Sequence, residues 1–457
     1  GAETFIDLRS AVIRSAVLNG RELFPAGEGK NYDDEDGLPL PDLQASNELV
    51  VDADMAYTTT GEGLHRMVDP ADGQVYLYSQ FETADAKRVF ACFDQPDLKA
   101  RYTLTVTAPE NWVVVTNTIA KEAPAEGGGV LHQFEPTEIM STYLVALIAG
   151  PYHVVEDTYS DEHGTIPLRL LCRASLAEFL DSDRLFAETK EGFDFYHREF
   201  GRPYAFGKYD QIFVPEFNAG AMENSGAVTF LEDYVFKTTP NEALVERRAI
   251  TVLHELAHMW FGNLVTMRWW NDLWLNESFA EFMSHVAAAE NTKFGRAWTT
   301  FAAVEKNWAY RQDQLSTTHP VVAEISDLED VQVNFDGITY AKGAAVLRQL
   351  VAWVGQDNFM AGIRTYLRKH AWKNTILSDL FTELNASSGR DLQAWAEAWL
   401  DTAGVNTLIV KCEVDADSSI QDFTITQAAD AEYPTIRPHR IGIGLYILRS
   451  EERRVGK

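Results

Sequence analysis

The chain contains 457 residues and carries a formal net charge of −29, with 46% hydrophobic and 23% charged residues. A chain of this length exceeds a single compact core, so about two to four domains are expected, and the composition is that of a soluble globular protein. The excess of acidic residues argues against nucleic acids and anionic membranes as partners. No run of about eighteen or more apolar residues occurs, so the sequence predicts no membrane-spanning helix.

The three cysteines, Cys92, Cys172 and Cys412, are too few and too widely spaced for a disulfide framework or a zinc ribbon. Reduced thiols in a cytoplasmic protein are the expected state. Residues 1–5 have neither a basic region nor an apolar run, so no secretory signal is visible. The chain also begins without a methionine, which is consistent with the loss of a leader or an upstream segment.

Strand patterns dominate residues 1–151, for which we expect an N-terminal antiparallel β domain. Alternating or continuous apolar residues predict strands at 101–107, 112–117 and 142–148. Three consecutive glycines at 127–129 predict the tip of a hairpin. The segment 27–42 combines acidic residues, glycine and two prolines, so it predicts a solvated loop.

Helical periodicity follows in residues 152–402. It predicts helices at 176–200, 241–261, 275–290 and through most of 340–400. Gly201 and Gly262 are the expected stops of the first two helices, and Pro240 is the expected start of the second. Short strands are expected at 211–217 and 227–231. Strand patterns return in residues 403–457, at 407–414 and 440–448.

The segment from His254 to His258 reads His-Glu-Leu-Ala-His, and Glu277 follows after eighteen intervening residues. Residues four apart share a helix face, so His254 and His258 can direct two imidazoles at one metal ion. Glu277 on the next helix completes a set of two histidines and one carboxylate. This set leaves a tetrahedral zinc with one open position, as catalytic sites require, and we expect one zinc per chain. Glu255 is then placed to take a proton from a water in that position.

A chance match on an ordinary helix, with the two histidines as a surface pair, is the alternative. The apolar segments 249–253 and 259–261 flank the motif on both sides and indicate a buried helix. Two buried histidines without a metal or hydrogen-bond partners would be costly. The flanking residues therefore favour zinc.

A glycine-bearing turn, Gly220-Ala221-Met222-Glu223-Asn224, follows the strand expected at 211–217. Glycine would let the backbone approach an extended peptide, which can pair with a sheet edge. Glu223 would then place a carboxylate near the end of that peptide. Taken alone, the pentapeptide is more simply an ordinary turn.

The two motifs together resemble those of the aminopeptidase N family of zinc exopeptidases, and the resemblance extends over essentially the whole chain. It implies that Glu223 binds the free α-amino group of a peptide substrate. The segment 78–82, which precedes the Phe-Asp-x-Pro-Asp-like stretch 92–97, matches a second family carboxylate at Glu82 and a pocket-lining residue at Gln80.

The stretch Thr339-Tyr340-Ala341-Lys342-Gly343-Ala344 matches the family's tyrosine pattern. The resemblance implies that Tyr340 donates to the oxyanion of the tetrahedral intermediate. Without it, Tyr340 is one of 17 tyrosines and more simply a core residue. Ser278 stands where many relatives have glycine; it flanks a ligand and is not expected to disturb the metal.

The family fold implied is a multidomain α+β architecture. It comprises an N-terminal β-sheet domain at 1–151, a thermolysin-like catalytic domain at 152–402 and the beginning of a β-sandwich at 403–457. Relatives continue into a large helical domain, so we expect this chain to be a fragment that lacks it. The polar, arginine-rich end at 449–457 is compatible with either native or non-native sequence.

The function implied is hydrolysis of the first peptide bond of peptides with a free N-terminus by a monomer. Glu255 acts as base and then as acid, and Glu82 and Glu223 hold the substrate ammonium. An endopeptidase zincin shares the metal motif but has no use for two carboxylates closing the cleft. A leukotriene hydrolase would carry Gly-Gly-Met-Glu-Asn, whereas Ala221 favours a plain aminopeptidase. An inactive scaffold would be expected to lose ligands, and this chain keeps them all.

Overall fold

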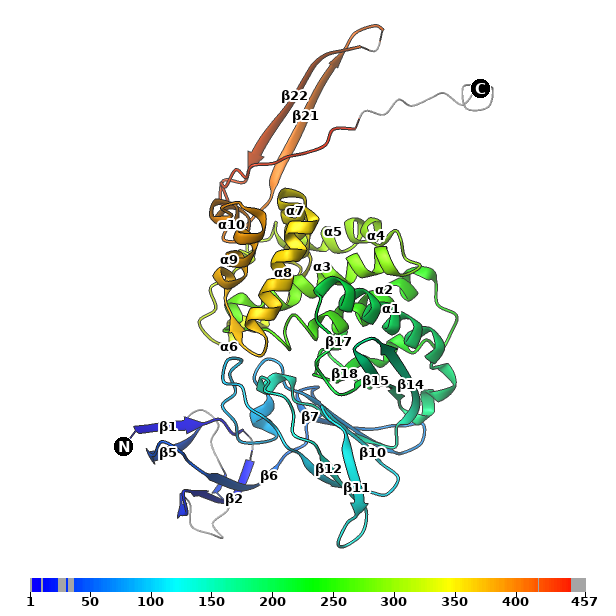
Figure 1. Ribbon diagram of the computed structural model, residues 1–457, viewed down its shortest axis with the longest axis vertical. Helices are drawn as coiled ribbons and strands as arrows, with labels where there is room; N and C mark the ends of the chain where they lie inside the picture. Colours follow the sequence, from blue (N-terminus) through cyan, green and yellow to red (C-terminus); the bar gives the residue numbers. More distant parts are fainter. Residues whose placement is uncertain (1, 10, 24–29, 32–36, 418, 445–457) are drawn as a thin grey trace.

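The computed structural model describes residues 2–9, 11–23, 30–31, 37–417 and 419–444. Figure 1 shows β-sheets near the N-terminus, then a body of helices beside a sheet, and finally a two-stranded hairpin that projects from the helices. This order confirms the expected mixed α+β architecture. None of the described helices is long and apolar enough to span a membrane.

Short strands build the part of the chain before residue 151 (Figure 1). Two small sheets at the N-terminus pair β1 (Ala2–Ile6) with β5 (Leu38–Leu43), and β2 (Ala11–Leu18) with β3 (Arg21–Glu22), β4 (Lys30–Asn31) and β6 (Leu49–Met55). A four-stranded sheet has the order β10 (Val113–Thr116), β13 (Leu147–Gly150), β8 (Val75–Gln80) and β7 (Gly63–Val68). A three-stranded sheet has the order β11 (Ala120–Pro124), β12 (Val130–Phe134) and β9 (Thr105–Ala108).

Several sequence predictions hold in these sheets and others are wrong. The strand expected at 112–117 is β10, and the glycines at 127–129 form the tip of the β11–β12 hairpin with φ of 93, 99 and 88°. The strand expected at 101–107 begins only at Thr105. The run 142–148 contains a 3₁₀ turn, η2 (Thr142–Leu144), before β13. The three residues of that turn are buried, so the apolar run reflects burial and not an extended backbone.

The loop prediction at 27–42 is also wrong in part. Residues 38–42 belong to β5, where Leu38 and Leu40 are buried against the N-terminal core. Pro39 is tolerated there because β5 pairs with β1 alone, so no second neighbour needs its missing N–H. Residues 27–29 and 32–36 lie outside the described part of the chain.

A five-stranded mixed sheet lies beside the helical body. Its order is β14 (His153–Asp161), β15 (Gly164–Cys172), β16 (Tyr209–Val214), β18 (Ala227–Leu231) and β17 (Ala221–Met222). The strands β15, β16 and β18 run parallel, whereas the edge strands β14 and β17 are antiparallel to their neighbours. The short strand β17 therefore forms one edge of the sheet.

Three long helices pack against this sheet and one another (Figure 1). They are α1 (Ser182–Phe200), α2 (Glu242–His258) and α3 (Trp274–Asn291). The helix α1 ends at Gly201, whose φ of 60° suits glycine, as expected. Short 3₁₀ helices precede or follow them at η3 (Ala174–Phe179), η4 (Glu232–Tyr234) and η5 (Trp270–Asp272), and η1 (Ala86–Arg88) lies after β8.

Shorter helices complete the body. They are α4 (Ala297–Ala303), α5 (Glu305–Gln312), α6 (Leu328–Gln332), the π-helix η6 (Ile338–Lys342), α7 (Gly343–Val354), α8 (Gln356–His370), α9 (Leu377–Ser388) and α10 (Gln393–Trp399). The small sheet of β19 (Thr266–Met267) and β20 (Asn374–Thr375) joins the segment after α2 to the segment after α8. The helices expected at 275–290 and through most of 340–400 are confirmed.

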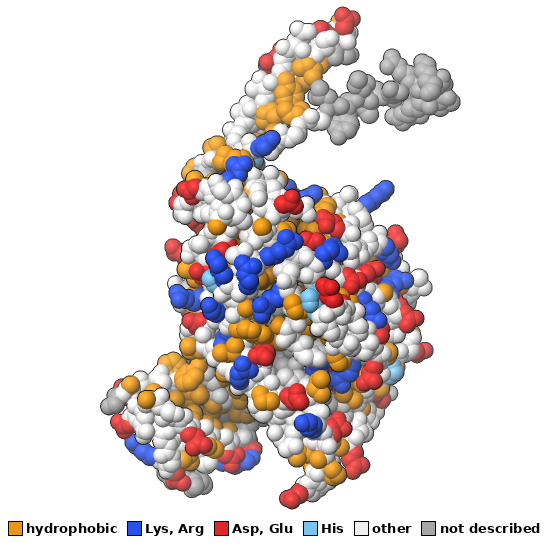
Figure 2. All heavy atoms as spheres, in the orientation of Figure 1, with side chains coloured by type: hydrophobic (Ala, Val, Ile, Leu, Met, Phe, Trp, Pro, Cys, Tyr) orange, Lys and Arg blue, Asp and Glu red, His pale blue; other side chains and the backbone are white. Residues whose placement is uncertain are grey.

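The chain continues as a hairpin of β21 (Asn406–Val414) and β22 (Ile420–Ala429), which contains the strand expected at 407–414. Figure 2 shows apolar side chains on its surface; the exposed ones include Leu408, Ile409, Val410, Val414 and Ile420. The strand expected at 440–448 is not formed in its described part, 440–444.

The N-terminal sheets interlock with the helical body near the end of β8. The Tyr78 hydroxyl donates to the Glu216 carbonyl at 3.0 Å, and His65 Nε2 lies 3.0 Å from Glu216 Oε2. Asn276 on α3 donates to the Tyr143 hydroxyl at 3.2 Å. One buried apolar cluster also takes side chains from both parts. These contacts fix the end of β8 relative to α3.

Candidate functional site

The helix α2 presents His254, Glu255 and His258 at its C-terminal end. Asn241 caps the other end, because its side chain accepts the Leu244 N–H at 2.9 Å. Every residue from Ala249 to His258 is buried, as the flanking apolar segments predict. The helix ends four residues before Gly262, the expected stop. Glu277 lies in the first turn of α3, which packs on α2.

Three ligand-type atoms from these two helices converge. His258 Nε2 lies 3.0 Å from His254 Nε2 and 3.4 Å from Glu277 Oε2, and His254 Nε2 lies 3.3 Å from the same oxygen. The three side chains are 1–8% exposed. The helical spacing thus brings together the two histidines and the distant carboxylate that the sequence predicts.

The opposite ring nitrogens fix the tautomers of both histidines. His258 Nδ1 faces the Phe261 carbonyl at 2.9 Å, and His254 Nδ1 faces Glu281 Oε2 at 3.2 Å. Both acceptors place a proton on Nδ1, so in the neutral imidazole each Nε2 carries the lone pair that can bind a metal. Two lone pairs and a carboxylate oxygen then point at one another inside the protein.

This donor set fits zinc. A tetrahedral zinc with bonds of about 2.0–2.2 Å holds its ligand atoms about 3.3–3.6 Å apart, and the separations here are 3.0–3.4 Å. Two facing lone pairs would repel in a buried site, so a cation must lie between them. Without a metal this cation is a proton, since, against the lowering effect of burial, Glu277 and Glu281 raise the pKa of His254 to about 9. Two histidines and one carboxylate are a ligand set of catalytic zinc. The residues present therefore suit the ion that the sequence predicts.

Ser278, the residue after Glu277, packs directly against Gly343. The Ser278 hydroxyl donates to the Thr339 carbonyl at 2.5 Å, which ties α3 to the π-helix η6. A Cβ on residue 343 would lie 1.9 Å from Ser278 Oγ, so only glycine fits there. Ser278 thus contacts the turn that carries Tyr340, a role that sequence reasoning missed.

Tyr340 lies on η6, where the wider π-turn replaces regular α-helical bonding. Its ring stacks on His254 with centroids 6.0 Å apart and an interplanar angle of 16°, and Trp308 packs against it at 6.2 Å. Burial, with Glu277 and Glu82 nearby, raises the pKa of Tyr340 well above its ordinary value. The phenol stays protonated and can donate a hydrogen bond.

The segment from Gly220 to Asn224 contains the edge strand β17 and borders the same cavity. Asn263, five residues after His258, donates to the Glu223 carbonyl at 2.8 Å and so anchors the turn to the segment that follows α2. Asn224 does not reach the cavity; its amide donates to Thr229 at 3.3 Å. Gly220, Ala221, Met222 and Glu223 do line it.

Gln80 and Glu82, at and just after the end of β8, reach the cavity from the N-terminal sheets. The Gln80 amide lies 3.4 Å from the sulfur of Met222, so the two segments touch. One oxygen each of Glu82, Glu223 and Glu277 lies within 4.8 Å of the others. The cavity has a volume of about 450 Å³.

Burial sets the charge states of the carboxylates. Burial raises the pKa of Glu255 to about 8, against the opposing effect of the two histidines. Burial and the carboxylates of Glu223 and Glu277 raise the pKa of Glu82. Burial alone would raise the pKa of Glu277 too, but His258 and His254 lower it to about 2. Glu277 is therefore the ionised member of the group.

Sequence reasoning missed Glu281, the partner of His254. It is 6% exposed and lies one helical turn after Glu277, so the spacing of four residues was the available signal. Burial by itself would raise the pKa of Glu281, but His285 and His254 lower it to about 2. An ionised carboxylate thus orients one of the two histidines.

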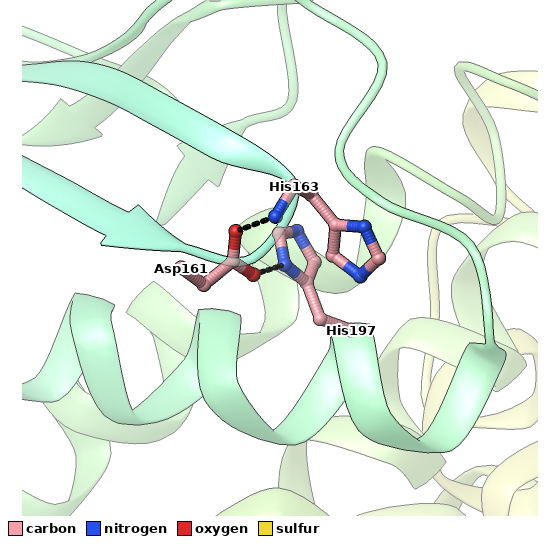
Figure 3. Close-up of side chains that lie close together, drawn as sticks. All are labelled: Asp161, His163 and His197. Carbon is pink, nitrogen blue, oxygen red and sulfur yellow. Dashed lines mark hydrogen bonds and ion pairs between the residues drawn. The ribbon is translucent and has the colours of Figure 1, made fainter.

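A second group of possible ligands, Asp161, His163 and His197, lies on the β14–β15 hairpin and α1 (Figure 3). His197 Nδ1 faces Asp161 Oδ2 at 2.6 Å, and the Tyr204 N–H donates to His197 Nε2 at 2.9 Å. The second bond places the ring proton on Nδ1, which leaves no lone pair there for a metal. The His163 backbone N–H donates to the other Asp161 oxygen at 2.8 Å. These bonds fasten the hairpin to α1.

Comparison with known proteins agrees with this geometry. Residues 185–399 match the peptidase family M1 domain, and residues 43–144 match the peptidase M1 N-terminal domain. The chain is 54% identical to aminopeptidase N of Streptomyces lividans over 98% of its length, which is 52% of that protein. It is 38% identical to a leucyl aminopeptidase of Saccharolobus solfataricus, over 73% of this chain and 42% of that one.

Aminopeptidase M1 of Arabidopsis thaliana is 34% identical, over 80% of this chain and 41% of that protein. The chain thus spans about half the length, or less, of the curated relatives it matches. The two domain matches cover more than half of the chain and include every predicted site residue. The chain belongs to peptidase family M1.

Proposed function

We propose that this protein is a zinc aminopeptidase, which removes the first residue from peptides with a free N-terminus. The observation that carries the proposal is the approach of Glu82 and Glu223, from separate parts of the chain, beside the group of His254, His258 and Glu277. Carboxylates at that position suit the ammonium of a peptide N-terminus. The names of the relatives, including aminopeptidase N and leucyl aminopeptidase, support the same activity.

His254, His258 and Glu277 would hold one zinc ion. Zinc supplies Lewis acidity, which polarises a carbonyl and makes a water acidic near neutral pH. Glu255 follows the first histidine in sequence and lines the cavity. It takes the proton that the hydrolytic water loses and returns it to the leaving amine. The Tyr340 hydroxyl donates to the oxyanion of the tetrahedral intermediate.

Glu82 and Glu223 restrict cleavage to the first peptide bond. Both have a carboxylate oxygen that is buried without a hydrogen-bond partner. A free α-ammonium satisfies these oxygens, whereas an acetylated N-terminus would leave them buried and unpaired. The edge strand β17 offers its backbone to the peptide beside this position. An endopeptidase would gain nothing from this arrangement.

We also propose domain boundaries at 151/152 and 402/403. The strand β13 ends at Gly150 and β14 begins at His153, while α10 ends at Trp399 and β21 begins at Asn406. The first boundary separates the sheets that supply Glu82 from the part that supplies the metal ligands. The second separates the helical body from the hairpin.

The proposal is tested by the selectivity of Glu82→Gln and Glu223→Gln. Each substitution keeps the shape and removes a charge-assisted contact of about 1.5–3 kcal/mol, so kcat/KM for a free-amine substrate should fall roughly 10- to 150-fold. Cleavage of the N-acetylated counterpart should not fall, because it makes no such contact. The ratio of kcat/KM for a matched pair of aminoacyl and N-acetyl-aminoacyl chromogenic amides measures the effect.

Glu62→Gln is the matched control. Glu62 lines the same cavity, but it pairs with Arg88 at 3.1 Å. Its substitution should leave the selectivity ratio at the wild-type value. An unchanged ratio in both Glu82→Gln and Glu223→Gln, at unchanged zinc content, would remove the case for an exopeptidase.

Glu281→Gln should weaken zinc binding by about 10- to 100-fold, the usual effect of removing a partner that orients a ligating histidine. The carboxylate keeps the proton of His254 on Nδ1 and strengthens Nε2 as a ligand. Titration of the metal-free protein with zinc against a competing chelator measures the change.

Glu305→Gln controls for the loss of a buried carboxylate near the site. Glu305 is 8% exposed and lines the cavity, but it pairs with Arg247 at 2.8 Å and touches no ligand. Its zinc affinity should match that of the wild type. Equal zinc affinity in Glu281→Gln would show that Glu281 does not orient His254.

A further inference from the structure

The cavity gathers more carboxylates than one zinc ion needs as ligands. Four of its carboxylates, Glu82, Glu223, Glu255 and Glu277, lie around the metal group. Buried carboxylates that lie this close together are stabilised when a cation binds between them.

Within the described part of the chain, no side chain supplies such a cation. Arg247 is the one lysine or arginine among the described residues that line the cavity, and its guanidinium is engaged by Glu305 at 2.8 Å. Glu223 and Glu255 are 3% and 5% exposed, and each has a carboxylate oxygen without a hydrogen-bond partner. One oxygen of Glu82 is in the same state. Glu82, Glu223 and Glu255 all line the cavity, so a positively charged ligand there can pair with these oxygens.

The oxygens also have the spacing of metal ligands. Ligand atoms of Glu82, Glu223 and Glu277 lie within 4.8 Å of one another, and so do those of Glu223, Glu255 and His258. Glu223 belongs to both sets, and Glu277 is shared with the zinc group. A cation beside Glu223 would therefore sit next to the zinc position and within reach of the catalytic base.

We propose that Glu82 and Glu223, together with the shared Glu277, form a second divalent-cation site, which is filled in the absence of substrate and blocks the position of the substrate amine. The inference rests on the proposed function, since the amine and the cation compete for the same two carboxylates. An oxygen-only ligand set binds zinc less tightly than one with two imidazoles. The second ion therefore enters only after the first.

Two effects make this ion inhibitory. It neutralises Glu82 and Glu223, so the α-ammonium of a peptide loses its partners. It also lies near Glu255, whose unpartnered oxygen is then drawn to the cation and away from water. Excess zinc should raise the apparent KM for free-amine substrates, and saturating substrate should relieve the inhibition.

Zinc stoichiometry tests the proposal directly. Metal-free wild-type protein is titrated with zinc by isothermal calorimetry, with equilibrium dialysis as a second measurement. Two equivalents should bind, the second more weakly. Glu82→Gln and Glu223→Gln should each weaken the second equivalent roughly tenfold or more, since each removes one charged ligand. Glu305→Gln, which removes a carboxylate of the same cavity outside the group, should bind both equivalents like the wild type.

An amine probe ties the second equivalent to the substrate position. An amino-acid amide with a free α-amine should weaken binding of the second zinc, whereas its N-acetylated form should not. If the wild type binds only one zinc per chain, the inference is overturned. It is also overturned if a second zinc binds but neither Glu82→Gln nor Glu223→Gln weakens it. Both results leave the first zinc site, and with it the proposed function, untouched. If the wild type instead bound no zinc at all, the result would contradict the proposed function, so the two failures are distinct.

Discussion

Glu255→Gln should keep its zinc and lose activity by at least about 10²–10⁴-fold, the usual scale for removing a general base. The loss can exceed this range because the same carboxylate also returns the proton to the leaving amine. Gln fills the same volume and cannot accept a proton, so the cavity and the three ligands stay in place. The measurements are kcat/KM on an aminoacyl chromogenic amide and zinc content by elemental analysis.

His258→Ala is the control that distinguishes the loss of the general base from the loss of the metal ion. His258 is 1% exposed and points its Nε2 at the ligand group, so its removal should abolish both zinc binding and activity. Metal loss should also lower the melting temperature, since zinc binding stabilises the folded chain. Near-normal activity in Glu255→Gln at full zinc occupancy would show that another group takes the proton.

Tyr340→Phe should lower kcat by about 10²–10³-fold, as expected for one oxyanion donor. The hydroxyl is needed only when charge develops on the carbonyl oxygen, so KM should change little. The ring stays stacked on His254 and against Trp308 after the substitution, which keeps the cavity wall intact. Steady-state kinetics with a free-amine substrate measure the split between kcat and KM.

Tyr310→Phe is the matched control. Tyr310 lies on α5 and is 43% exposed, outside the residues that line the cavity. Its substitution should leave kcat and KM at the wild-type values. A change confined to KM in Tyr340→Phe would assign this tyrosine to substrate binding and not to the oxyanion.

The candidate metal site can be predicted from the spacing of residues along the chain. His254 and His258 are four residues apart in a helix, and this period alone places them on one face. The apolar residues around them correctly predict that the helix is buried. Glu277 could be predicted from the sequence because it follows the motif after eighteen intervening residues, on the next predicted helix. The location in the cytoplasm and the monomeric state stay predictions.

Tertiary packing decided the second half of the site. Gln80 and Glu82 lie more than a hundred residues before Glu223, and only the interlocking of β8 with the segment around Glu216 brings them to the cavity. The resemblance to a family identified these two residues as part of the site. The residues next to them in the sequence predict only the end of a strand. The same holds for Tyr340, whose position depends on the π-turn η6.

The residues that sequence reasoning missed act through contacts between distant segments. Glu281 orients His254 from another helix, and Ser278 holds the turn of Tyr340 from α3. The run 142–148 shows the same limit, because its first three residues form a buried 3₁₀ turn and only Leu147 and Ile148 belong to a strand. The sequence by itself determined which local faces are buried and which two helices carry the candidate metal ligands. Only the tertiary structure decided which partners those faces meet, because hydrophobic periodicity encodes burial without naming a neighbour.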